Sequence, residues 1–263
     1  MVIPSYNQGR FLEAAIRSVL LQDYPREKVE CIVIDGGSTD ESKNVMVHYA
    51  GWLTHSVSEP DRGQAHAINK GFQHATGDLR SYLNSDDLHA PGCFMAVARA
   101  ARRQPDVGVF HGERILLGGD DEVLGWTSQP QFDPAVSGYT VASETAFWRA
   151  SLAEVGGGFD ESLRFAMDLD FFGRLHSSGV KFRKLDRFLG YFRCHADAKS
   201  ATLQDVCAEE SQRLWQGHFK RDAPARESLP KGSGIRLILG GLRSPVRVLL
   251  PYVKTRILRM LRR

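Results

Sequence analysis

The sequence predicts an α/β domain in which helices flank a mainly parallel sheet, followed by a helical extension. Over the first two-thirds of the 263 residues, short β-branched runs alternate with segments whose apolar residues recur at helical spacing. Polar clusters directly follow three of the predicted strands, where open α/β sheets bind ligands. The strand pattern ends near residue 200, so we predict a domain over 1–200 and a helical extension over 201–263, basic from about residue 231.

The first two strand and helix units occupy roughly the first fifty residues. Residues 1–3 are expected to end a strand that Pro4 stops, and this strand is short enough to leave open a natural start upstream of Met1. A helix with one apolar face follows, marked by Leu12, Ala15, Ile16, Val19 and Leu20. Residues 29–34 indicate a second, buried strand, and Ser38-x-x-Glu41 is the spacing of a capping box, predicted to begin the next helix.

Two further strands and a helix complete the predicted site edge. We expect strands near Val57 and over residues 79–83. The helix between them is marked by Ala65, Ile68, Phe72 and Ala75. The carboxyl ends of these strands bring their polar loops into one cleft with the loops that follow the first two strands.

The remaining elements are more widely spaced. After Pro91 we expect a helix, a strand over 107–110 and a hairpin turn at 118–121. A helix is predicted from Asp168 to about residue 178, and a strand over 180–192. Beyond these the pattern indicates helices only.

Composition favours a soluble globular protein in a reducing compartment. The 42% of hydrophobic residues and 25% of charged residues exclude a mostly disordered chain. The four cysteines lack C-x-x-C spacing, which indicates neither a zinc site nor a disulfide framework. No apolar run is long enough to cross a bilayer and no signal peptide is visible, so we expect a cytoplasmic protein that is neither membrane-spanning nor secreted.

The basic residues are concentrated at the end of the chain. Residues 231–263 hold nine lysines and arginines and no acidic residue, which leaves residues 1–230 with a net charge of −6 out of the total of +3. Leucines and other aliphatic residues alternate with these arginines, and two interpretations are open. The segment either forms interfacial helices at the anionic inner face of the cytoplasmic membrane, or docks on the domain with its arginines solvated. Nucleic acid is not an expected partner, because no recognition motif accompanies the charge.

Six motifs occur in the order found in one enzyme family. They are Val2-Ile3-Pro4-Ser5-Tyr6-Asn7, Ile34-Asp35-Gly36-Gly37-Ser38-Thr39-Asp40, Glu59-Pro60-Asp61-Arg62-Gly63-Gln64, Leu83-Asn84-Ser85-Asp86-Asp87, Gly157-Gly158-Phe159-Asp160-Glu161 and Asp168-Leu169-Asp170. Over residues 1–200 the chain thereby resembles the family 2 glycosyltransferases, bacterial polysaccharide enzymes with the GT-A fold. The resemblance implies an inverting transfer of a sugar from a UDP-, GDP- or dTDP-linked donor to a hydroxyl of a glycan or lipid-linked acceptor, in cell-surface polysaccharide biosynthesis.

The resemblance also implies a metal site at the triplet Asn84-Ser85-Asp86, which lies where the family has its D-x-D motif. A divalent cation, Mn²⁺ or Mg²⁺, offsets the charge that grows on a departing diphosphate. Asp86 is the predicted metal ligand, while Asn84 and Ser85 are predicted to contact the nucleotide sugar. His195 is predicted to be a further metal ligand or a diphosphate contact. The alternatives are an ordinary polar turn for the triplet and a surface position for the histidine.

By the same resemblance, five other residues are predicted to line the nucleotide pocket. Asp35 should contact the base, because a carboxylate accepts hydrogen bonds from the ring N–H groups of uracil or guanine. Ser5 and Tyr6 are expected beside it, and Asp61 and Gln64 in the same pocket. The alternatives are a turn or helix-capping role for Asp35 and an ion pair of Asp61 with Arg62.

Asp168 matches the position of the family's catalytic base, which removes the proton of the acceptor hydroxyl. Residues two apart on a helix point in nearly opposite directions, so Asp168 and Asp170 are not expected to face the same cleft. Met167 stands where many relatives have a glutamate. The alternative for both aspartates is favourable charge placement at a helix N-terminus.

Three more residues are candidates for contacts with the substrates, and two other functions are alternatives. Arg193 is a candidate phosphate contact, and Glu144 and Trp148 fall in the segment that faces the acceptor in relatives, although a core tryptophan is an alternative. A sugar nucleotidyltransferase is disfavoured because residues 4–9 lack the glycines and the lysine of a triphosphate loop. A non-catalytic nucleotide-sugar-binding module is the other alternative, and retention of both Asp86 and Asp168 disfavours it.

Overall fold

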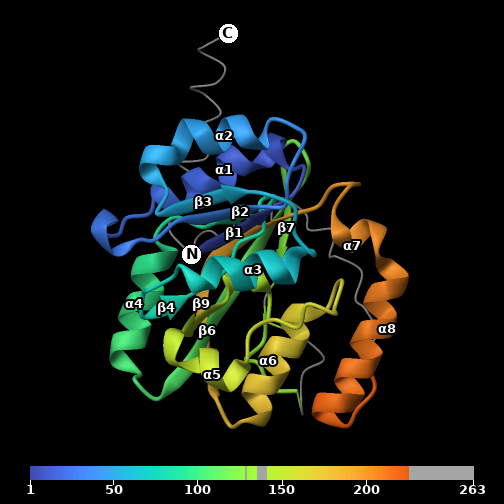
Figure 1. Cartoon of the computed structure of the whole chain (residues 1–263). Coiled ribbons are helices and arrows are strands. Elements are labelled where there is room, and N and C mark those ends of the chain that lie inside the picture. Colours follow the sequence, from blue (N-terminus) through green and yellow to red (C-terminus); the bar gives the residue numbers. More distant parts are fainter. Residues whose placement is uncertain (128, 135–140, 225–263) are drawn as a thin grey trace.

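A computed structural model describes residues 1–127, 129–134 and 141–224. Its N-terminal part is a parallel sheet in the order β1-β2-β3, made of β1 (Val2–Ser5), β2 (Ile32–Asp35) and β3 (His55–Ser58). Helices α1 (Gly9–Leu20) and α2 (Ser42–Tyr49) cover one face and α3 (Gln64–Gln73) covers the other (Figure 1).

The alternation of side chains along the strands separates two cores. Ile3 and Val33 pack under α1 and α2, whereas Val2 and Ile34 pack with α3. The predicted amphipathic helices are therefore confirmed. Each helix buries its apolar face against the strand side chains that point to its side of the sheet.

Two details of the prediction are wrong. Pro4 does not stop β1 but pairs in register with Ile34, because the ladder to β2 uses the neighbouring residues and needs no N–H from the proline. Ser38 does not cap α2 either. Its hydroxyl donates to Asp35, and the helix begins only at Ser42, whose N–H donates to the Asp40 carboxylate.

The second sheet is mixed, so the expected parallel pattern holds for only part of the molecule. Its path is β4-β8-β6-β9-β5, with β7 added to β6. The strands are β4 (Leu79–Arg80), β5 (Leu88–His89), β6 (Val107–Leu117), β7 (Val123–Thr127), β8 (Phe147–Arg149) and β9 (Lys181–Arg193). Only β6 and β9 run parallel, and the turn at 118–122 makes β6 and β7 an antiparallel hairpin. The predicted strand over 79–83 is shorter than expected, with Tyr82 joining β1 by an isolated parallel bridge.

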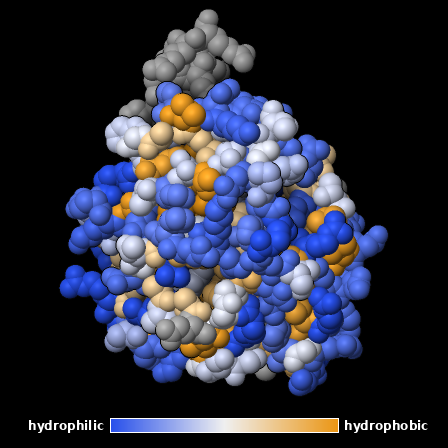
Figure 2. Space-filling model, viewed as in Figure 1, coloured by the Kyte–Doolittle hydropathy of each residue, from blue (hydrophilic) through white to orange (hydrophobic). Residues whose placement is uncertain are grey.

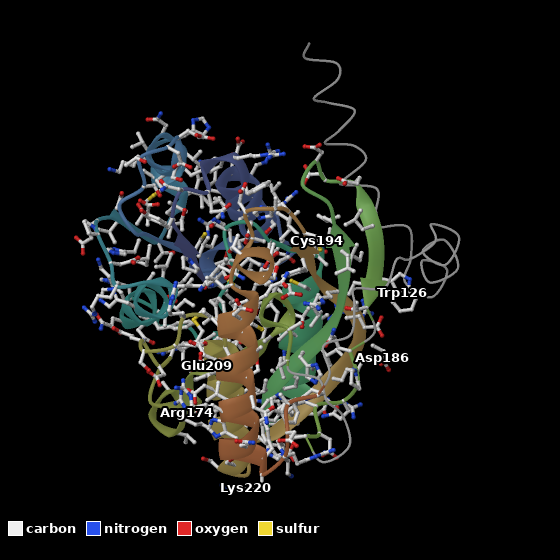
Figure 3. All side chains as sticks on the ribbon, turned by 90° about the vertical axis from the view of Figure 1, so that its right-hand side faces the viewer. Trp126, Arg174, Asp186, Cys194, Glu209 and Lys220 are labelled. Atoms are coloured by element: carbon white, nitrogen blue, oxygen red, sulfur yellow. The ribbon has the colours of Figure 1, made fainter. Side chains whose placement is uncertain are left out.

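Helices after the first sheet bury the remaining apolar surface. They are α4 (Cys93–Arg103), α5 (Ala153–Gly156), α6 (Met167–Ser177), α7 (Lys199–Thr202) and α8 (Gln204–Leu214), with a π-helical turn at Trp215–Phe219. Trp215 packs on Ala166 and Leu169, so residues 199–219 rest against α6. In Figure 3, α8 runs down the face turned to the viewer, with Glu209 on it and Lys220 just past its end.

The predicted basic segment lies outside the described residues. Within the described residues, no helix is long and apolar enough to cross a bilayer. Figure 2 shows that the face viewed in Figure 1 is mostly hydrophilic, with apolar residues in small separate patches. The helices at 199–219 pack on the body, while the predicted boundary near residue 200 stays a prediction.

Candidate active site

The turn after β2 is organised by Asp35. Its carboxylate is fully buried and accepts hydrogen bonds from the Ser58 hydroxyl at 2.6 Å, the Ser38 N–H at 2.8 Å and the Gly37 N–H at 3.2 Å. The Ser38 hydroxyl donates a fourth. Three of these hydrogen bonds end on Oδ2 and one on Oδ1, so Oδ1 keeps one acceptor position. The structure supports the turn interpretation for Asp35, while the base contact predicted for it stays a prediction.

The loop after β1 closes on the same turn. Asn7, with a φ of 50°, accepts a hydrogen bond from the Thr39 N–H at 2.9 Å and donates its own N–H to the Ser38 hydroxyl at 2.7 Å. Ser5 is buried, and its hydroxyl has no hydrogen-bond partner among the described residues. Tyr6 is 63% exposed. This loop therefore offers an unpartnered hydroxyl and an exposed aromatic ring beside the Asp35 turn.

Asp61 and Gln64 reach the site from the start of α3. A Cβ placed on Gly36 would lie 2.7 Å from Asp61 Oδ2, so the glycine gives the Asp61 carboxylate room to approach the Asp35 turn. Asp61 accepts a hydrogen bond from the Gly63 N–H at 2.7 Å, while Arg62 pairs with Glu161. The alternative of an Asp61–Arg62 ion pair is therefore wrong.

The triplet Asn84-Ser85-Asp86 lies opposite Gln64. The Gln64 amide donates to Asn84 Oδ1 at 2.5 Å, and the Asn84 amide donates to Asp87 Oδ2 at 3.2 Å. Ser85 and Asp87 are buried. Burial raises the pKa of Asp87 well above its usual range, and the charges of Asp86 and Glu144 raise it further.

Asp86 and His195 meet although 109 residues separate them. His195 Nε2 lies 3.1 Å from Asp86 Oδ2, and the imidazole packs against Phe11 with ring centroids 4.9 Å apart and an interplanar angle of 48°. The histidine side chain is only 7% exposed, so the surface alternative is wrong. A carboxylate and an imidazole are suitable donors for Mn²⁺.

The metal-binding capacity of the protein itself is limited. Within the described residues, no three His, Cys, Asp or Glu side chains are grouped to hold an ion by themselves. One carboxylate with one neighbouring imidazole fits a cation whose other ligands are substrate phosphates and water, which is the usual arrangement for Mg²⁺.

The Arg193 side chain is buried and held by contacts within the protein. Its guanidinium is 2% exposed, donates to the Asp86 backbone carbonyl at 2.7 Å and pairs with Asp121. It also lies 4.7 Å from the centroid of the Phe11 ring. The predicted phosphate contact is wrong, because these partners enclose the cation and tie it to the loop that carries Asp86.

Asp168 lies in the first turn of α6 and has a single backbone partner, the Leu169 N–H at 2.8 Å. Burial raises its pKa to about 6, and the charge of Glu144 adds to the rise. Asp170 points elsewhere and pairs with Arg174 at 2.7 Å and His218 at 3.0 Å. The predicted opposite orientation of the two aspartates is confirmed, and only Asp168 shares electrostatic interactions with the site.

Glu144 and Trp148 are both buried. Trp148 is 2% exposed and packs among Phe72, Phe159 and Phe171, so it is a core residue and not a sugar platform. Glu144 is equally buried and pairs with Arg114 at 3.4 Å. Its charge contributes to raising the pKa of both Asp87 and Asp168.

Two residues of the site region were missed from the sequence. Lys199 donates to Gln64 Oε1 at 2.7 Å, and Glu210 accepts the backbone N–H groups of Arg164, Phe165 and Ala166 at 2.8 to 2.9 Å. Glu210 thus holds the segment directly before α6. Neither residue belongs to a recognisable motif, and both reach the site because α7 and α8 fold back on α6.

Comparison with known proteins agrees with this geometry. Residues 1–140 match the family model described as Glycosyl transferase family 2. An uncharacterised glycosyltransferase of Nostoc sp. is 31% identical over 126 residues, which are 47% of this chain and 38% of that protein. One of Rickettsia typhi is 26% identical over 249 residues, 89% of this chain and 75% of that protein. One of Mycobacterium tuberculosis is 30% identical over 171 residues, 64% of each.

Solved structures show the same fold. TarS 1–349 of S. aureus in complex with UDP-GlcNAc superposes with a TM-score of 0.62 at 19% identity, over 82% of this chain and 72% of that one. The mannosyltransferase PcManGT of Pyrobaculum calidifontis, in complex with GDP-Man and Mn²⁺, gives 0.63 at 19% identity, over 94% and 69%. The fold is therefore that of the GT-A glycosyltransferases.

Proposed function

Because this chain belongs to glycosyl transferase family 2, we propose that it is an inverting enzyme that moves a sugar from a nucleotide-diphosphate donor to an acceptor hydroxyl. The observation that carries the proposal is Asp168, a carboxylate at the start of α6 whose pKa is raised by burial and whose charge, like that of Asp86, acts on Lys199. The relatives named above supply the class of donor. A polysaccharide or lipid-linked acceptor, and transfer at the cytoplasmic face of the membrane, complete the proposal.

Asp168 is the proposed general base. The acceptor oxygen forms its bond to the anomeric carbon as Asp168 takes the hydroxyl proton, and the bond between that carbon and the phosphate oxygen breaks on the opposite face. With a pKa of about 6 the carboxylate is mostly ionised at neutral pH. It is also a stronger base than a solvated aspartate, which supports the assignment.

Asp86, assisted by His195, would hold Mn²⁺ or Mg²⁺. Such a cation, when bound, neutralises charge on the diphosphate. Arg193 fixes the backbone of Asp86, and Phe11 supports the His195 ring, so the protein holds both side chains in place.

The nucleotide is proposed to lie along the loops after β1 and β2. Ser5 offers an unpartnered hydroxyl, and Tyr6 an exposed ring for stacking. Asp61, Gln64, Asn84 and Ser85 border the other side. Asp35 supports this pocket by fixing the turn that it shares with Ser58 and Gly37.

The test is release of nucleotide from a panel of UDP-, GDP- and dTDP-sugars, with Mn²⁺ or with EDTA. We expect metal-dependent turnover of one donor, lowered about 10²- to 10⁴-fold by Asp168→Asn, the usual range for loss of a general base. Asp86→Ala should abolish the metal dependence. Asp186→Asn, at a side chain 93% exposed, is the matched control and should behave as wild type.

The contrary outcome is equally specific. Tight nucleotide binding without turnover, even when a lipid extract supplies acceptors, would mean that the protein is a non-catalytic nucleotide-sugar-binding module.

A further inference from the structure

Lys199 is a cation within the candidate active site that the proposed function does not use. It begins α7, and its ammonium donates to Gln64 Oε1 at 2.7 Å. Burial lowers the pKa of Lys199, whereas the charges of Asp168, Glu210 and Asp86 raise it. Lys199 therefore lies within electrostatic range of both the proposed base and the proposed metal ligand.

Two other cations near these carboxylates have acidic partners. Arg193 pairs with Asp121, and Arg114 pairs with Glu144. Over the described residues Lys199 forms no salt bridge within 4.0 Å, and the hydrogen bond of its ammonium goes to a neutral amide. Its charge is therefore available to a ligand.

A diphosphate that enters this site is repelled by the negative charges of the carboxylates there. The site holds the carboxylates Asp86, Glu144 and Asp168, and a nucleotide diphosphate brings further negative charge. A charge-assisted hydrogen bond from the Lys199 ammonium offsets this repulsion.

The position of Lys199 selects one of the two phosphates. Asp168 must face the anomeric carbon in the proposed reaction, and the β-phosphate is the group bonded to that carbon through oxygen. Lys199 is joined through Gln64 to Asn84, two residues before the proposed metal ligand Asp86, and the charge of Asp168 acts on it as well. We therefore place its ammonium on the sugar side of the diphosphate, beside the β-phosphate.

We propose that Lys199 is a donor-site cation whose ammonium leaves Gln64 and donates hydrogen bonds to the β-phosphate of the nucleotide-diphosphate sugar. This rests on the proposed function. When the bond between the anomeric carbon and the phosphate oxygen breaks, its electron pair stays on that oxygen. Lys199 stabilises the added charge and keeps its proton.

The experiment is calorimetric titration of the full chain, with Mn²⁺ present, using UDP and UMP, with GDP and GMP in parallel. Lys199→Met should weaken binding of the diphosphate about 10- to 100-fold, as expected for loss of a charge-assisted hydrogen bond, and leave monophosphate binding unchanged. Lys199→Arg should restore most of the diphosphate affinity. Lys181→Met, at an exposed lysine paired with Asp106, is the matched control.

Three results would contradict the proposal. Equal diphosphate affinity in wild type and Lys199→Met would overturn the contact while leaving the proposed function intact. Parallel loss of UDP and UMP binding would show a general effect on the pocket and also overturn it. If wild type binds neither UDP nor GDP, the proposed function itself fails, and the role of Lys199 fails with it.

Discussion

Two aspartates at element ends, Asp35 after β2 and Asp168 at the start of α6, have opposite surroundings. Asp35 is fully buried but accepts four hydrogen bonds from nearby N–H and hydroxyl groups. Asp168 is half-buried with one backbone hydrogen bond, and its pKa is raised to about 6. The difference shows that hydrogen-bond supply, more than burial, determines whether a buried carboxylate is structural or chemically reactive.

The comparison predicts opposite effects of one substitution at the two positions. Asp35→Asn can keep its amide oxygen toward the N–H groups of Gly37 and Ser38, which turns its NH₂ group toward the Ser38 hydroxyl. Because the hydrogen bonds of this buried group lose their charged acceptor, we expect the free energy of unfolding to fall by about 2–3 kcal/mol, measured by urea denaturation at pH 7.

Asp186→Asn serves as the control for the Asp35 substitution, since that side chain is 93% exposed. An Asp35→Asn protein as stable as the control would mean that the four hydrogen bonds are not what holds the turn.

Sequence reasoning succeeded where contacts are local. The βα units around β1 to β3 could be predicted because their apolar spacing is complete within each segment, and the opposite orientation of Asp168 and Asp170 follows from helix geometry alone. The mixed sheet was not predicted, since pairing of β6 with β9 joins residues about seventy apart. Lys199 and Glu210 were missed for the same reason: Glu210 binds backbone N–H groups, which have no sequence pattern.

A second prediction tests whether the base is positioned from outside its own helix. Glu210→Gln keeps one acceptor oxygen for the three N–H groups of residues 164–166 that it now binds. We expect the free energy of unfolding to fall by about 1–3 kcal/mol. Because α6 would begin less rigidly, kcat should fall while the KM for the donor changes little.

The neighbouring Glu209 provides the matched control, because it is exposed on the same helix (Figure 3). Glu209→Gln should keep both stability and kcat. If Glu210→Gln lowers stability but leaves kcat unchanged, Glu210 supports the fold only and does not position Asp168.

The smallest expected effect is the change in stability caused by Asp168→Asn, and its sign shows whether the Asp168 charge destabilises the fold. The pKa of Asp168 is about 6 in the folded protein against an ordinary value of 3.8, so the folded state holds this proton more tightly than the unfolded state. Its contribution to stability is therefore present below about pH 4 and is lost as the pH rises through 6. Asp168→Asn, which stays neutral, should be more stable than wild type by about 1–2 kcal/mol at pH 8, after allowance for partial exposure.

This gain should vanish near pH 4, where wild-type Asp168 is largely protonated as well. Urea denaturation of both proteins at pH 4.5 and pH 8 measures the difference, with Asp186→Asn as reference. A variant that is less stable than wild type at pH 8 would show that the Asp168 carboxylate is stabilised in the fold as Asp35 is. A gain in stability together with a loss of turnover would instead mean that the protein keeps a destabilising charge at this position for its chemistry.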